Sequence, residues 1–144
     1  MNGGPHMKSC CMNQYRTPQV GETVSFRKTM TVAEQAMFTG ISGNLCALYV
    51  DRTSARLEGL ADQAVFELAA TSLVTTCLAR AGGSNRRIAS MSTEFLRPVT
   101  VGETVEACAK VIETGETISF EVSLCVNEER VMRGTAVLVP VSNA

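Results

Sequence analysis

The stretch SGNLCALYVD, from Ser42 to Asp51, combines a hydroxyl, an amide, a thiol and a phenol, and contains no histidine. General acid–base catalysis needs a group whose pKa lies near the working pH. Asn44 cannot exchange a proton near neutrality, and Tyr49 is a poor base because the reference pKa of a phenol is about 10. Both side chains can still donate hydrogen bonds to a carbonyl oxygen. The loop therefore favours binding of a ligand over proton transfer.

Glu67 is the candidate catalytic residue, because it lies in an otherwise apolar segment, residues 61–83, that predicts a helix. A carboxylate on an apolar helix face costs several kcal/mol unless it is paired or faces a cavity. The helix dipole offsets only about 0.3–1 kcal/mol of this cost. Glu67 therefore either serves a ligand or catalytic site, or it is a residue at the beginning of the helix that faces water or pairs with a basic side chain such as Arg52, Arg56 or Arg97.

Three further residues have two interpretations each. The Ser72 hydroxyl either binds a ligand or hydrogen-bonds to its own helix. Asp62 is expected as a charge in the first helical turn, with activation of a water as the alternative. Cys46 is a nucleophile if its pKa is lowered, but it is expected as a filler, because no histidine lies nearby to lower that pKa.

The pattern of apolar residues predicts the elements that must position these side chains. Residues 23–30 alternate like a strand, and Thr31 with Glu34 forms a capping box that begins a short helix ending near Gly43. A brief helical turn is expected over 51–60, followed by the long helix over 61–83. Strands are then predicted at about 88–97, 103–113, 117–127 and 130–140. This order predicts an α+β fold.

The long helix is apolar on nearly every side, which predicts that it is buried. A sheet that wraps the helix covers one side of it only. We therefore expect a second copy of the chain to cover the rest, giving a homodimer.

Composition limits the remaining function classes. With 144 residues, 45% hydrophobic and 19% charged, the chain fits one domain, assigned to residues 17–144. Residues 1–16, which include GPHM, are interpreted as a flexible leader or cloning scar. A net charge of −1 gives no electrostatic basis for a nucleic-acid partner.

The cysteines and the hydropathy predict the environment of the chain. Six scattered cysteines without a C-x-x-C pair, and a single histidine at position 6, predict reduced thiols and no metal site. No secretory signal and no membrane span are expected, so the chain is assigned to the cytoplasm.

Three segments give the chain a resemblance to a known family. FTGISGN (38–44), VDRTSA (50–55) and EFLRPVTVGETV (94–105) resemble the MaoC-like hydratases and dehydratases of the hot-dog fold. This resemblance implies a curved antiparallel sheet wrapped around one long central helix. It also implies an acyl thioester ligand, either acyl-CoA or an acyl carrier thioester, and no cofactor other than the coenzyme A of that ligand.

The same resemblance implies that the hydratase site is degenerate. Ser42 and Gly43 match the loop of the family, and Asp51 matches its trailing aspartate. Asn44 stands where the family has its catalytic aspartate, and Tyr49 where it has its catalytic histidine. We therefore expect no (R)-enoyl-CoA hydratase activity.

The positions on the long helix extend the expected site. The helix serine of the family falls on Ser72, and its histidine at the beginning of the helix falls on Phe66, which could also plug a tunnel. The expected substrate-binding residues are Ser42, Asn44, Tyr49, Phe66, Glu67 and Ser72. One alternative is an acyl-CoA thioesterase that uses Glu67, and another is an accessory protein with a self-filled pocket.

Overall fold

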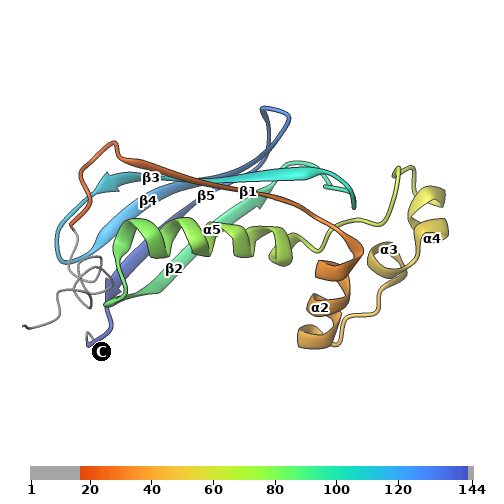
Figure 1. The fold of residues 1–144 in the computed structure, drawn as a ribbon, viewed down its shortest axis with the longest axis horizontal. Coiled ribbons are helices and arrows are strands. Elements are labelled where there is room, and N and C mark those ends of the chain that lie inside the picture. The colour runs from red at the N-terminus through yellow and green to blue at the C-terminus, as the bar shows by residue number, and fades with distance from the viewer. Residues whose placement is uncertain (1–16, 143–144) are drawn as a thin grey trace, which may run out of the picture.

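A five-stranded antiparallel sheet and one long helix form the body of the protein (Figure 1), in a computed structural model that describes residues 17–142. The leader expected over 1–16 lies outside the described residues. The elements along the chain are β1 (Thr23–Thr29), α2 (Val32–Ser42), α3 (Ala47–Val50), α4 (Arg52–Leu57), α5 (Glu67–Gly82), β2 (Arg86–Phe95), β3 (Thr104–Glu113), β4 (Ile118–Val126) and β5 (Glu129–Pro140). The strands lie in the order β1-β3-β4-β5-β2. This arrangement confirms the predicted α+β class.

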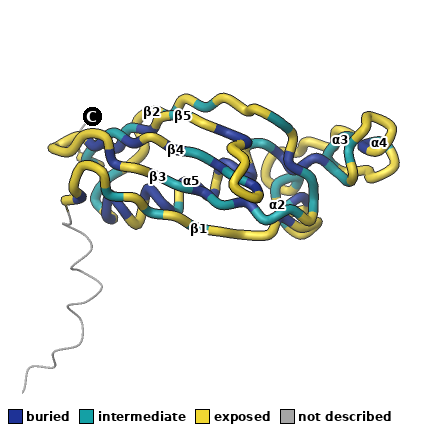
Figure 2. The backbone as a smooth tube through the Cα atoms, turned by 90° about the horizontal axis from the view of Figure 1, so that it is seen from above, coloured by how far each residue is buried: buried dark blue, intermediate teal, exposed yellow. Residues whose placement is uncertain are grey.

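The sheet covers one side of α5, and the small helices lie beyond one end of it (Figure 1). The inward side chains of β3 and β4 alternate with outward ones, as a sheet with one covered face requires. Viewed from above, the buried residues follow α5 and the inner strands, whereas α3 and α4 are largely exposed (Figure 2).

The long helix begins later than the sequence predicts, at Glu67 instead of residue 61. Residues 63–65 run beside the segment before β3, where Val65 N donates to Val99 O at 2.7 Å and Val101 N donates to Gln63 O at 2.9 Å. These tertiary backbone bonds override the local helix propensity. The prediction for Asp62 was therefore wrong: this residue lies outside the helix.

One face of α5 remains exposed in the single chain. Nine residues of this helix are buried, including Val74, Cys77 and Leu78. The exposed residues include Leu68, Ser72, Thr75 and Ala79, which recur at helical spacing. The helix is thus covered by its own sheet on one side only, which is the geometry behind the expectation of a second copy.

The last turn of α5 packs closely on β5. A Cβ atom added to Gly82 would lie 2.3 Å from Cδ1 of Leu138. A side chain at position 82 would require Leu138 to move, so the C-terminal end of the helix packs directly on β5.

Helix α2 begins and ends as the sequence predicts. Thr31 and Glu34 form the capping box, and Gly43, in a left-handed conformation with φ of 73°, ends the helix. The apolar side chains of Met37 and Ile41, however, are exposed. The one buried residue of α2 is Gln35.

Between residues 17 and 142, no helix has both the length and the apolar character that crossing a bilayer requires.

Candidate functional site

The carboxylate of Glu67 and the phenol of Tyr49 meet at the beginning of α5. Tyr49 lies in α3, and its Oη donates to Glu67 Oε1 at 3.1 Å and to Oε2 at 2.9 Å. Glu67 is the first residue of α5, whose N-cap Phe66 provides no side-chain cap. The structure thus brings together two residues that the sequence places in one site.

The rings of Tyr49, Phe66 and Phe38 form one packed cluster. The ring of Tyr49 stacks on that of Phe66, with the ring centroids 4.4 Å apart. The ring of Phe38 also contacts Phe66, with the centroids 4.7 Å apart. Phe66 itself is 2% exposed. Stacking of this kind adds to the apolar burial of the rings and fixes the direction of the phenol.

The surroundings of Tyr49 keep its phenol protonated. Burial, followed by the hydrogen bond and the negative charge of Glu67, raises the pKa of Tyr49 to about 12. At neutral pH this residue therefore donates a hydrogen bond and does not act as a base.

None of the three arginines expected as partners of Glu67 reaches it. Arg52 Nε lies 3.1 Å from Asp62 Oδ1, and Arg56 Nε donates to the carbonyl oxygen of Ala61. Arg97 pairs with Glu103 and Glu129, at 3.5 and 3.2 Å. The carboxylate of Glu67 is thus held by a neutral donor.

A small cavity lies beside Glu67, between the first turns of α5 and strands β2, β4 and β5. Its volume is about 20 Å³, and Ala70, Arg97 and Met132 contribute to its walls. A volume of this size accommodates about one water molecule.

The polar side chains of the loop after α2 serve the loop itself. Ser42 Oγ donates to Phe38 O at 2.8 Å and accepts from Asn44 N at 3.1 Å. Asn44 Oδ1 accepts from Cys46 N at 2.9 Å. Ser42 and Asn44 are exposed, and neither makes a hydrogen bond to Tyr49 or Glu67 within the described part of the chain.

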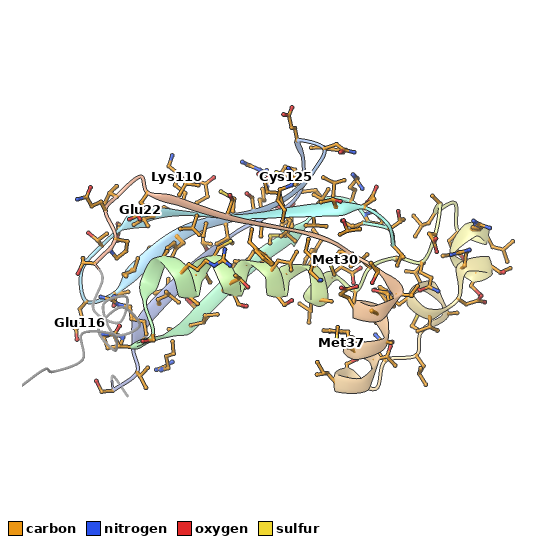
Figure 3. The ribbon with its side chains drawn as sticks, viewed as in Figure 1. Glu22, Met30, Met37, Lys110, Glu116 and Cys125 are labelled. Carbon is orange, nitrogen blue, oxygen red and sulfur yellow. The ribbon has the colours of Figure 1, made fainter. Side chains whose placement is uncertain are left out.

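Ser72 lies in an apolar groove on the exposed side of α5. Its Oγ donates to Ala69 O of its own helix. The groove has a volume of about 360 Å³ and runs between the end of β1, α2 and α5. Two of its wall residues, Met30 beyond β1 and Met37 on α2, are labelled in Figure 3. The other wall residues are Lys28, Glu34, Phe38, Ile41, Ala69, Ser72 and Leu73.

The cysteine thiols and acidic side chains between residues 17 and 142 form no disulfide and no metal site. The four cysteines between residues 17 and 142 are free, with Cys77 buried and Cys46 exposed. In the same range, no group of three or more His, Cys, Asp or Glu side chains is placed to hold a metal ion.

Sequence reasoning missed Gln35, which is 4% exposed and hydrogen-bonds to the backbone of both site segments. A polar residue at this position could have been recognised only by knowing which face of α2 meets the rest of the protein.

Comparison with known proteins places the chain in a family. A family model of the thioesterase superfamily matches residues 60–131, which is half of the 144-residue chain. The chain belongs to the thioesterase superfamily. The matched part contains α5 with Glu67, whereas Tyr49 and its loop precede it. No match was found among curated proteins.

Solved structures share the fold. The chain is similar to the (R)-hydratase from A. caviae involved in PHA biosynthesis, with a TM-score of 0.80 and 22% identity over 85% of this chain and 96% of that one. It is similar to the R-hydratase PhaJ1 from Pseudomonas aeruginosa, with a TM-score of 0.79 and 16% identity over 85% and 81%. The ChsH1-ChsH2 complex from Mycobacterium tuberculosis matches with a TM-score of 0.76 and 18% identity over 85% and 98%. These likenesses confirm the hot-dog fold.

Proposed function

We propose that this protein binds acyl thioesters, either acyl-CoA or an acyl carrier thioester, at the beginning of α5. One observation carries the proposal: the apolar groove reaches the first turn of α5 at Ala69, two residues after Glu67, whose carboxylate is held by a phenol. Membership of the thioesterase superfamily supports the same ligand class.

The acyl chain and the thioester carbonyl of such a ligand each have a matching surface. The acyl chain lies among Met37, Ile41 and Leu73, where burial contributes about 25 cal/mol per Å² of apolar surface. The thioester carbonyl accepts hydrogen bonds from the first N–H groups of α5, since helix N-termini leave these donors unpaired. The side chain of the N-cap residue, Phe66, does not accept hydrogen bonds from these N–H groups.

Hydration of an enoyl thioester is not part of the proposal, although two similar structures are hydratases. Asn44 offers an amide that is occupied within its own loop, and Tyr49 stays protonated. Neither residue can activate a water at neutral pH.

Thermal unfolding with acetyl-, octanoyl- and palmitoyl-CoA, and with free coenzyme A, tests the binding. A ligand at 100 times its Kd stabilises by about 2.7 kcal/mol. We expect stabilisation that grows from the acetyl to the octanoyl ester and exceeds that of free coenzyme A. Equal shifts with and without an acyl chain, or no shift, would reject the groove as the acyl site and favour the accessory protein with a self-filled pocket.

A matched pair of variants localises the acyl chain. Ile41 and Leu57 are both 83% exposed, but only Ile41 lines the groove. Ile41→Asp should weaken octanoyl-CoA binding at least about tenfold by placing a charge beside the chain. Leu57→Asp should leave the affinity unchanged, and equal losses in both variants would contradict the assignment.

Hydrolysis of the thioester is a second candidate function, favoured by the cavity of about 20 Å³ beside Glu67. Glu67 would take a proton from a water there, while the water oxygen bonds to the carbonyl carbon. The C–S bond then breaks, and the sulfur leaves as a thiol with the proton returned. The products are a carboxylic acid and free coenzyme A.

Chromatographic measurement of free coenzyme A released from octanoyl-CoA tests this second candidate. Glu67→Gln should lower the rate by about 10²-fold or more, because the loss of a general base typically has this effect. Glu113→Gln, at the exposed end of β3, is the matched control. Binding without any turnover in the parent protein would reject hydrolysis and leave the binding proposal standing.

A second copy of the chain completes the proposal. The face of α5 that carries Leu68, and the edges of the sheet at β1 and β2, are uncovered by the described residues of one chain. A homodimer would bury the apolar part of this surface.

A further inference from the structure

We infer that Gln35 is the positioning residue of this site, with its amide fixing the placement of Tyr49 relative to Glu67. The inference deepens the proposed function and rests on it. Gln35 Nε2 donates to Tyr49 O at 2.7 Å and to Ala64 O at 2.8 Å, and its Oε1 accepts from Phe66 N at 3.2 Å. One side chain of α2 thus joins α3 to the entry of α5.

The three hydrogen bonds use both N–H donors and the carbonyl acceptor of the Gln35 amide. A glutamine offers two N–H donors and one carbonyl acceptor, and here two carbonyls meet the donors while an N–H meets the acceptor. The partners therefore fix the orientation of the amide, because a flipped group would face two carbonyls with an oxygen. A methionine of similar length would make none of these bonds.

Two of the three bonds fall on Tyr49 and on the residue before Glu67. Tyr49 O belongs to the residue whose phenol holds the carboxylate, and Phe66 N belongs to the residue that precedes Glu67. The segments also touch directly at one backbone bond, from Ala64 N to Leu48 O at 3.1 Å. Gln35 adds a hydrogen bond to each of these two segments, at Tyr49 O and at Ala64 O.

The side chain of Gln35 is buried, so its amide does not serve as a solvated surface group. It is the one buried residue of α2, while Met37 and Ile41 of the same helix are exposed. A buried amide destabilises the fold unless its hydrogen bonds are made. An apolar residue would suffice to attach α2, so the amide serves the segments that it holds.

A spectroscopic test separates positioning from a structural role alone. The chain has two tyrosines and no tryptophan, so Tyr15→Phe leaves Tyr49 as the sole tyrosine. Ultraviolet absorbance of tyrosinate then reports the ionisation of Tyr49 directly. The variants Gln35→Met, which removes all three bonds, and Gln35→Glu, which keeps the acceptor, are titrated in this background. Val74→Ala, in the core of α5, is the control for lost stability.

We expect Gln35→Met to move the pKa of Tyr49 from about 12 toward its ordinary value of 10.0. Octanoyl-CoA should bind at least about tenfold more weakly, because a displacement of about 1 Å is enough for large losses. Gln35→Glu should lie between the parent and Gln35→Met, and provides the readout if Gln35→Met does not fold. Val74→Ala should unfold at lower temperature with both properties unchanged.

An unchanged pKa of Tyr49 in both Gln35 variants would overturn the inference. The tyrosine readout needs no ligand, so the two proposals fail separately. A shifted pKa in a protein that binds no thioester supports positioning by Gln35 and rejects the proposed function. Bound thioester with an unchanged pKa and affinity in Gln35→Met rejects the positioning role alone.

Discussion

The phenol of Tyr49 donates to both carboxylate oxygens of Glu67, at 3.1 and 2.9 Å, across 18 positions of sequence. The resemblance to MaoC-like hydratases implies a histidine at the position of Tyr49, whose phenol stays protonated at neutral pH and donates a hydrogen bond. The carboxylate comes from the helix that the thioesterase superfamily model covers. The pair therefore joins the part of the chain that matches the superfamily to the part that precedes the match.

The ionisation of Tyr49 should depend on Glu67. In Tyr15→Phe, we expect tyrosinate to form with a pKa of about 12, and Glu67→Gln to lower this value without reaching 10.0. Burial is the largest cause of the shift and remains in the variant. Because the folded-state pKa exceeds the ordinary one, the stabilising contribution of this group is fully present below pH 10 and is lost as pH rises toward 12. A parent pKa near 10 would contradict the contact.

The capping box of α2 should make the protein sensitive to acid. The hydrogen bond from Thr31, followed by the interaction with Lys28, lowers the pKa of Glu34 from 4.5 to about 2. This stabilising contribution is present above pH 4.5 and is lost as pH falls toward 2. Glu34→Gln should therefore reduce the dependence of urea unfolding on pH in this window. An unchanged dependence would exclude Glu34 as its source.

The loop residues should prevent hydration of enoyl thioesters. We expect no loss of the enoyl absorbance of crotonyl-CoA with the parent protein, because Asn44 and Tyr49 cannot activate a water. Asn44→Asp combined with Tyr49→His returns an acid–base pair to these positions and should gain hydration. The single variant Asn44→Asp is the control, since it lacks the histidine. Brisk hydration by the parent would show that the interpretation of the loop is wrong.

The exposed face of α5 should hold two copies together. Leu68 is 63% exposed on this face, so Leu68→Asp should shift the mass measured by light scattering from twice the protomer to one protomer. Leu57→Asp, on α4, should leave the dimer intact. A parent protein with the mass of one protomer at working concentration would rule out the proposed homodimer.

The alternation of apolar residues was enough to predict the strands. Residues such as Val105, Ala107, Ile118 and Phe120 are fully buried on the covered face, as their spacing requires. Local chemistry also predicted α2, because a capping box and a terminal glycine act within a few residues. Interactions of this range are visible in a sequence without knowledge of the fold.

The beginning of α5 and the arrangement of the site depend on longer-range contacts. Residues 63–65 are extended because they bond to Val99 and Val101, which lie more than thirty positions later. The sequence indicated Glu67 and Tyr49 separately, but not that one would hold the other in place of an arginine. Gln35 escaped notice for the same reason, because its three partners lie on segments 14 to 31 positions away.

The absence of a side chain at Gly82 has a mechanical consequence for the opposite end of α5. Leu138 Cδ1 lies where a Cβ would stand, so a larger residue at position 82 would displace either the Leu138 side chain or this end of the helix. At about 1.5 Å of rise per residue, Glu67 lies roughly 22 Å from Gly82 along the helix axis. A substitution at Gly82 that tilted the helix by about 5° about this end would therefore displace the carboxylate by about 2 Å, at the place where the ligand is proposed to bind.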